Sequence, residues 1–216
     1  MTQVAHNKNL CEITLLGNLV SKPEIRYQVN PVVAIAEIKI ATHSRWFDKA
    51  NNKFKEWTSF HTVKVIGDIV EATLIHADKG DVILVHGYLL NSQKTNREII
   101  HATFAQTFSK GYAQSLNQIQ CSGKINSDIQ LVTTEQNKEL AEFQISISHQ
   151  VHSPVTQNIH TFNLERLVHV WGKQAHYLKE HAQINDQVVI EGRLNYFTNA
   201  TKSQFIEAKQ VVLLKA

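Results

Sequence analysis

The chain has 216 residues, with 22 Lys and Arg against 19 Asp and Glu and only two cysteines. No apolar run reaches the roughly 18 residues that span a bilayer, and the first residues lack the apolar centre of a secretory signal. A membrane-spanning protein and a disulfide-stapled scaffold are therefore not expected, and we expect a cytoplasmic protein with reduced thiols. The formal net charge of +3 is weak, so any nucleic-acid site must depend on where the charges lie.

The first half of the chain consists of alternating runs separated by turn residues. Residues 11–20 alternate around Gly17, which predicts a strand with a bulge or sharp bend. Residues 68–76 carry apolar side chains at helical spacing, which predicts one short helix. The other predicted strands cover residues 32–42, 58–66, 82–90 and 98–107.

The second half repeats this order. Its predicted helix covers residues 174–181, again between the third and fourth strands. Its predicted strands cover residues 118–125, 140–150, 161–171, 187–194 and 204–214.

The two halves also match residue by residue. A shift of 105 aligns residues 36–40 with 141–145, 65–67 with 170–172 and 80–89 with 185–194, and the shift is 106 at Gly17 against Gly123. A period this long indicates duplicated domains, because solenoid repeats are far shorter. Cys11 and Cys121 do not occupy equivalent positions. We assign a first domain to residues 1–108, a linker to 109–117 and a second, divergent domain to 118–216.

The element order predicts the fold class. Five strands with one short helix between strands three and four is the layout of the OB-fold, a small barrel that binds oligonucleotides. An SH3-like or other small barrel is the alternative, and the position of the helix argues against it. We therefore expect an all-β protein of two tandem OB-folds.

A polar segment over residues 43–60 separates the second and third predicted strands. It holds four Lys or Arg and five aromatic residues among 18 positions. Cations neutralise phosphates while aromatic rings stack on unpaired bases, which is typical of single-strand binding. The alternative is a hairpin whose rings fold back on the barrel. We favour a loop at a nucleic-acid-binding face, with the following candidate contacts: Arg45, Trp46, Lys49, Lys53, Lys55, Trp57 and Phe60.

Other chemistry has little support in the sequence. The 12 histidines are spread over both halves without metal-ligand spacing, and structural zinc sites need three or four convergent ligands. Phosphate-binding loops, nucleophile elbows and paired catalytic carboxylates have no match either. We expect no metal, no cofactor and no enzymatic activity.

Three segments of the first half resemble a known family. LLGNLVSKPEIRY, AEIKIATHSRWFDKANNKFKEWTSFHTVKVIG and KGDVILVHGYL are similar to the bacterial single-stranded-DNA-binding protein family over nearly the whole first domain. The second domain is similar at CSGKI, AEFQISI, VHVWGK and QVVIEGRL, and it also resembles the related primosomal replication protein.

The resemblance implies site residues that are divided unequally between the domains. Its base-stacking aromatics match Trp46, Phe60 and Trp171, and its basic residues match Arg26, Lys49 and Lys173. The second domain also has Arg193, Tyr196 and Phe197, but it has Glu165 at the position of Phe60. The first domain has Ile66 and Asp68 where the family usually has an aromatic residue and a lysine. Each domain therefore lacks part of the site that the other retains.

The resemblance also implies a function and partners. We expect binding and protection of single-stranded DNA, without sequence preference, in replication, recombination, repair or mobile-element transfer. Family members with one OB-fold form tetramers, so two folds per chain imply a homodimer that presents four. The sequence continues only briefly past the last predicted strand, so we expect no acidic tail of the kind by which family members recruit partner proteins. The alternative is a primosome-like module whose second domain binds proteins.

Overall fold

The computed structural model of the protein describes residues 8–48, 51–92, 97–111, 114–134, 137–152, 158–198 and 203–214. These residues form two compact units. The unit of residues 13–117 is called the first barrel, and the unit of residues 118–216 with the described residues before Ile13 is called the second barrel. In the described ranges, no helix has the length and apolarity needed to cross a membrane.

The first barrel contains six strands and a short π-helix. The strands pair in the order β2-β3-β4-β6-β5-β1, and β1 also pairs with β3, which closes the barrel. Their bounds are β1 Cys11–Leu19, β2 Glu24–Gln28, β3 Val33–Asp48, β4 Lys53–Ile66, η1 Val70–Leu74, β5 Asp81–Asn91 and β6 Glu98–Lys110.

The second barrel has the same plan, with an α-helix at the place of η1. Its strands pair in the order β7-β11-β12-β10-β9-β8, and β7 also pairs with β9. The bounds are β7 Leu116–Ile125, β8 Gln130–Thr133, β9 Glu139–His152, β10 Ile159–Trp171, α1 Lys173–His181, β11 Gln187–Tyr196 and β12 Gln204–Leu214. The predicted fold class, two tandem OB-folds, is confirmed.

Each barrel closes at a glycine. β1 pairs with β5 through Asn18 and with β3 from Asn18 onward, so it changes partner beside Gly17. A Cβ atom on Gly17 would overlap the carbonyl oxygen of Ala41, and one on Gly123 would lie 2.6 Å from the carbonyl oxygen of Ser146. Both positions therefore need glycine, because the crossing backbones leave no room for a side chain.

The strand register is duplicated along with the sequence. Ala36 lies opposite Val65 in the first barrel, and Ala141 lies opposite Val170 in the second. The shift of 105 that aligns the two halves therefore also aligns their pairing. In both barrels, alternate residues of these strands point inward and are buried, including Ile38, Ile40, Val63 and Val65 in the first and Phe143, Ile145, Val168 and Val170 in the second.

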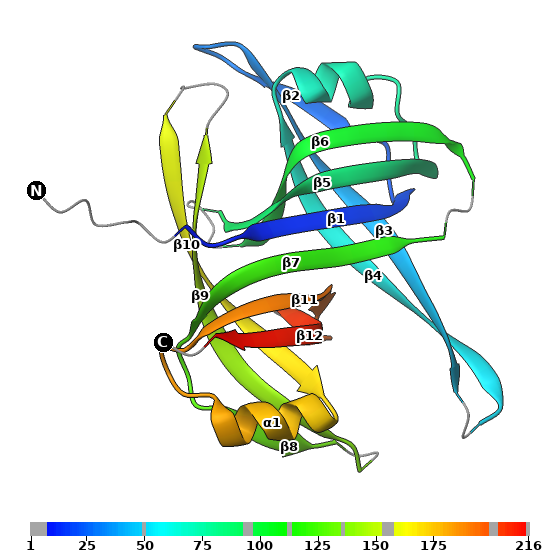
Figure 1. Cartoon of the computed structure of the whole chain (residues 1–216). Helices are drawn as coiled ribbons and strands as arrows, with labels where there is room; N and C mark the ends of the chain where they lie inside the picture. The colour runs from blue at the N-terminus through cyan, green and yellow to red at the C-terminus, as the bar shows by residue number, and fades with distance from the viewer. Residues whose placement is uncertain are drawn as a thin grey trace, which may run out of the picture. The chain divides into compact units, whose positions relative to one another are not determined.

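The structure differs from the sequence prediction in local detail. Within the segment predicted as a loop, residues 43–48 and 53–60 are the outer ends of β3 and β4, which continue as one long antiparallel hairpin (Figure 1). The loop prediction was wrong because opposed residues along the segment pair across the ribbon, from His43 with Thr58 to Asp48 with Lys53. Each barrel also carries one short additional strand, β2 or β8, which lies beside the next long strand.

Candidate nucleic-acid interface

The β3–β4 hairpin presents two different faces. Residues directly opposite each other in an antiparallel pair share a face. Trp46 lies opposite Lys55 and Ser44 lies opposite Trp57, on the face that is continuous with the barrel core. Arg45 opposite Glu56 and Phe47 opposite Phe54 lie on the other face, which is continuous with the outside of the barrel. Phe60, opposite Ala41, shares that outer face, so Trp46 and Phe60 do not lie side by side.

The aromatic side chains of the hairpin are exposed. Trp46 is 46% exposed, Trp57 48% and Phe60 56%. Rings that folded back on the barrel would be largely covered, so the alternative interpretation of this segment does not describe the structure. About half of each residue's surface is therefore accessible, so a stacking partner can reach these side chains, as single-strand binding requires.

The hairpin cations differ in how firmly they are engaged. Arg45 lies 3.5 Å from Glu56, with its guanidinium 4.2 Å above the Phe54 ring. Both side chains of this pair are exposed, and exposed pairs contribute about 0–1 kcal/mol, so a phosphate can compete for Arg45. Lys55 is held more firmly, because its Nζ lies 2.6 Å from Asp48, whose side chain is only 16% exposed. On β2, Arg26 forms an exposed pair with Glu24. Lys53 is exposed, and Lys49 lies outside the described residues.

Two further lysines extend the cationic surface beyond the hairpin. Lys39 on β3 and Lys64 on β4 occupy outward positions on the same face as Phe60. Glu37, which lies opposite Lys64, is paired with Arg97 at 2.7 Å. Among the described residues, neither lysine has a carboxylate within ion-pair distance. Sequence reasoning missed both, although they alternate with the buried positions of the same strands.

A neutral stacked pair borders Lys64. The rings of Tyr88 and His101 stack with centroids 5.0 Å apart, and His101 lies opposite Lys64 in the β4–β6 pairing. Burial, aided by the positive charge of Lys64, lowers the pKa of His101 to about 4. Burial also raises the pKa of Tyr88 to about 12. Both rings are therefore uncharged at neutral pH, and the positive charge here comes from the lysines.

The equivalent face of the second barrel has different chemistry. Glu165 replaces Phe60, in the same register opposite Ser146. Gln144 replaces Lys39, and His169 replaces Lys64 and lies 2.9 Å from Glu142. The stacked pair of Tyr88 and His101 is replaced by Arg193 and Glu207, which lie opposite each other in the same way.

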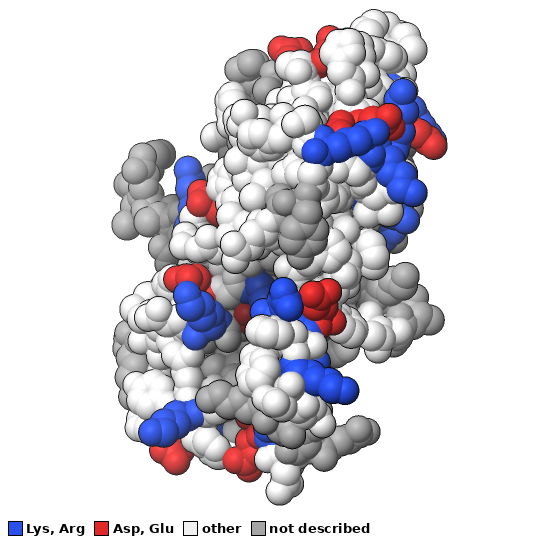
Figure 2. All heavy atoms as spheres, turned by 90° about the vertical axis from the view of Figure 1, so that its right-hand side faces the viewer, with Lys and Arg blue, Asp and Glu red and all other residues white. Residues whose placement is uncertain are grey.

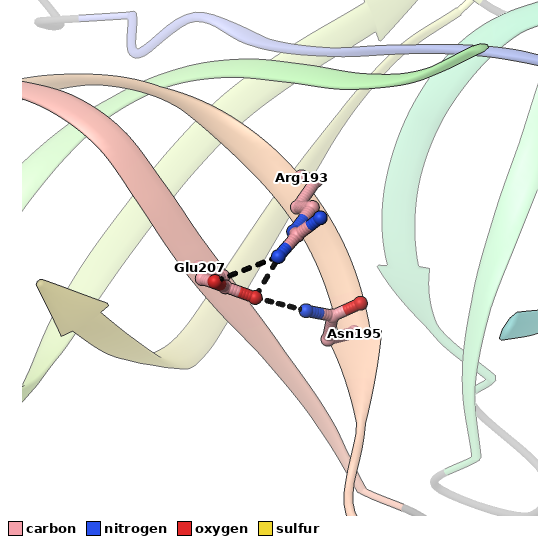
Figure 3. Close-up of polar contacts among 3 residues, drawn as sticks. All are labelled: Arg193, Asn195 and Glu207. Atoms are coloured by element: carbon pink, nitrogen blue, oxygen red, sulfur yellow. Dashed lines mark hydrogen bonds and ion pairs between the residues drawn. The ribbon is translucent and has the colours of Figure 1, made fainter. Parts of the chain in front are cut away.

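Arg193 is held by a carboxylate. Its Nε and Nη2 donate to the two oxygens of Glu207 at 3.0 and 2.9 Å, and Asn195 also donates to Glu207. Figure 3 shows the two β11 side chains converging on this single residue of β12. Because bidentate arginine–carboxylate pairs are among the stronger ion pairs, Arg193 is less available to a phosphate than an unpaired lysine.

The aromatic candidates of the second barrel are partly gathered together. Phe197 packs on Phe205 at 4.7 Å and against His169 at 5.8 Å. Trp171, 39% exposed, lies two residues beyond His169 on β10. Tyr196 is half-buried at the end of β11, and Lys173 is exposed at the first position of α1.

Charge is mixed over the surface. In the view of Figure 2, blue Lys and Arg are interspersed with red Asp and Glu, and most of the surface carries neither. The part of the chain that the structure describes also contains no group of three or more His, Cys, Asp or Glu side chains placed to hold a metal ion. An interface with nucleic acid therefore depends on single cations placed beside exposed rings.

Comparison with known proteins identifies the family. The family model described as "Single-strand binding protein family" matches residues 10–107 and again residues 116–214. The chain belongs to the single-strand binding protein family. Each of the two sequence repeats is covered by one match.

Two solved structures are similar to this chain over nearly its whole length. The wild-type single-stranded DNA binding protein from Thermus aquaticus is similar with a TM-score of 0.75 and 21% identity, over 97% of this chain and 95% of that one. A deletion variant of the Thermus protein gives a TM-score of 0.78 and 20% identity, over 97% and 96%. At this identity, the similarity establishes the fold over nearly the full length of both chains.

Proposed function

We propose that this member of the single-strand binding protein family binds single-stranded DNA without sequence preference, and that the first barrel is the stronger site. The observation that carries the proposal is the set of exposed rings beside surface cations on one hairpin and the adjoining outer face. The candidate residues of the first barrel are Arg26, Arg45, Trp46, Lys49, Lys53, Lys55, Trp57 and Phe60, and to these we add Lys39 and Lys64.

The chemistry of these residues supports binding that tolerates any base. Every base has a face that can stack on Trp46, Trp57 or Phe60, at about 1–3 kcal/mol per base. Lysine and arginine neutralise phosphates, which are the same in every sequence. A base-specific site would instead need polar groups positioned against base edges.

The second barrel contributes a weaker site. Trp171, Lys173, Arg193, Tyr196 and Phe197 remain its candidate residues. Glu165 and Glu142 place negative charge on the outward face of β10 and β9, and Glu207 holds Arg193 in an ion pair. Linking a weak site to a strong one raises its effective concentration, so the second barrel adds affinity once the strand is long enough to reach it.

The cellular role follows from this binding. The protein coats exposed strands during replication, recombination, repair or mobile-element transfer, in the cytoplasm and without catalysis. A homodimer would present four barrels to one strand. A second candidate function for the second barrel alone is docking of a protein partner, because its outer face carries carboxylates and an aromatic cluster where the first barrel has cations.

A titration tests the proposal. Fluorescent oligo(dT) of increasing length is titrated at several salt concentrations, together with oligo(dA) and a mixed sequence. We expect similar affinities for the three sequences and a linear fall of log affinity with log salt. Replacing Lys49, Lys53 and Lys55 together should reduce that slope by up to about 0.7 for each phosphate that is no longer neutralised. A fall in affinity confined to one sequence would indicate base readout and contradict the proposal.

A further inference from the structure

The compact units do not begin where the repeats begin. β1 starts at Cys11, but the described residues up to Glu12 belong to the second barrel. Likewise, residues 114–117, which lead into the second repeat, belong to the first barrel. The segment that precedes each repeat is therefore part of the unit formed by the other repeat. We call residues 8–12 the first arm and residues 114–117 the second arm.

The first arm is bonded to β7 and β9 of the second barrel. Asn9 N–H donates to the carbonyl oxygen of Ser148 at 2.9 Å, and Ser148 N–H donates to Asn9 Oδ1 at 2.8 Å. Leu10 N–H donates to Ser122 Oγ, and Ser122 N–H donates to the carbonyl oxygen of Leu10, both at 2.9 Å.

The second arm makes the corresponding bond in the first barrel. His43 N–H donates to Ser115 Oγ at 2.8 Å. His43 and Ser148 are equivalent under the shift of 105, and Asn9 and Ser115 are equivalent under the shift of 106. In both barrels, the arm side chain thus accepts a hydrogen bond from the same backbone amide.

This amide lies at the base of the hairpin. Just before His43, Ala41 and Thr42 are buried in the barrel, and just after it Arg45 and Trp46 are exposed. At the same level, the His43 ring bonds to Thr58 Oγ1 at 2.9 Å across the two strands. Beyond this level, the strand pairing of the described hairpin residues is between β3 and β4 alone. A hydrogen bond at this amide therefore restricts the orientation of the hairpin, and of its stacking rings, relative to the barrel.

We propose that Ser115 and Asn9 are positioning residues that brace the bases of the β3–β4 and β9–β10 hairpins for single-stranded DNA. The inference rests on the proposed function, because it gives the hairpins their role in binding. In this proposal, neither residue contacts the DNA. Each accepts the hydrogen bond that holds the point where the hairpin leaves the barrel.

The test uses the full chain with Ser115→Ala. Removal of one hydrogen bond should weaken oligo(dT) binding about two- to ten-fold. Hydrogen exchange of the backbone amides over residues 43–48 should become faster, while exchange in the buried strands stays unchanged. Ser115→Asn should restore both readouts, because Asn9 accepts the equivalent bond in the second barrel. Ser109→Ala, an exposed serine on β6, is the matched control and should behave as wild type.

The reciprocal variants test the second barrel in the same way. Asn9→Ala should accelerate exchange near Ser148, and Asn9→Ser should preserve protection there. Unchanged exchange at the hairpin bases in both alanine variants would overturn the proposal, and so would a fall in affinity that only follows a loss of overall stability. If the wild-type chain does not bind oligo(dT), the proposed function fails, while the exchange measurements still report whether the arms brace the hairpins.

Discussion

The outer faces of the two barrels share a backbone plan and differ in chemistry. The same register places Phe60 and Glu165 opposite equivalent residues, and it places the Tyr88–His101 stack where the second barrel has the Arg193–Glu207 ion pair. Inward positions of both barrels remain buried. Packing constrains the inward positions, so the outward ones can differ without altering the fold. Any difference in ligand binding between the two barrels therefore has to arise at the outward positions.

Exchanging the residues that distinguish the two faces gives the largest expected effect. Phe60→Glu in the first barrel removes a stacking ring and adds a charge that repels phosphate. Together these changes should weaken oligo(dT) binding by about 2–4 kcal/mol. The reciprocal Glu165→Phe should strengthen binding to long oligonucleotides. Equal affinities for wild type and Phe60→Glu would show that the outer face of the first barrel is not the binding face.

Acid should destabilise the first barrel by way of His61, which is fully buried. Burial lowers the pKa of His61 from 6.5 to about 4, so the unfolded chain binds more protons than the folded barrel between these values. Stability is therefore lost as pH falls from about 6.5 to about 4, by about 3 kcal/mol for this group. At the equivalent position the second barrel has a buried arginine, Arg166, which stays charged throughout this range.

Hydrogen exchange of each barrel as a function of pH measures this difference. The protection factors of the globally exchanging amides, which are corrected for the intrinsic pH dependence of exchange, should fall more in the first barrel than in the second as pH falls across this window. In His61→Gln, which cannot titrate, the part of the pH dependence due to His61 should disappear even if the variant is less stable at neutral pH. An unchanged pH dependence in the variant would argue against the role of His61.

Removing the Trp46 ring tests stacking on the face of the β3–β4 hairpin that is continuous with the barrel core. Trp46→Ala should weaken binding by about 1–3 kcal/mol, the contribution of one stacked base, with little change in stability because the ring is exposed. Quenching of tryptophan fluorescence on binding should also decrease. Val151, the equivalent residue of the second barrel, provides the matched control as Val151→Ala. Equal decreases in affinity in the two variants would contradict the proposal that the first barrel contributes more to binding than the second.

The smallest expected effect comes from releasing Arg193. Glu207→Gln removes the charge that holds the guanidinium, so Arg193 becomes available to a phosphate. Affinity for long oligonucleotides should rise about two-fold, and the salt slope should steepen by up to about 0.7. Glu191→Gln is the control, since Glu191 pairs with Lys209. If neither variant changes binding, the outer face of the second barrel does not contact DNA. Docking of a protein partner then becomes the better explanation of that face.

The sequence alone determined much of this protein. The alternation of apolar and polar residues predicted the long strands, because side chains in a strand alternate between two faces, and the repeat at 105 residues predicted the duplication. The density of cations and rings in residues 43–60 identified the hairpin as a candidate binding element. These features depend on residues close together in sequence or on a whole-domain match, so they can be read along the chain.

Only the tertiary structure decided which outward residues share a surface. Lys39 and Lys64 join Phe60 because β3 and β4 pair in one register, and Arg193 is held because β12 brings Glu207 beside it. The arms belong to units other than those of the repeats they precede, which the alignment of the two halves does not reveal. Interactions of this kind join residues far apart in the chain, and local patterns carry no information about them until the backbone has closed into a barrel.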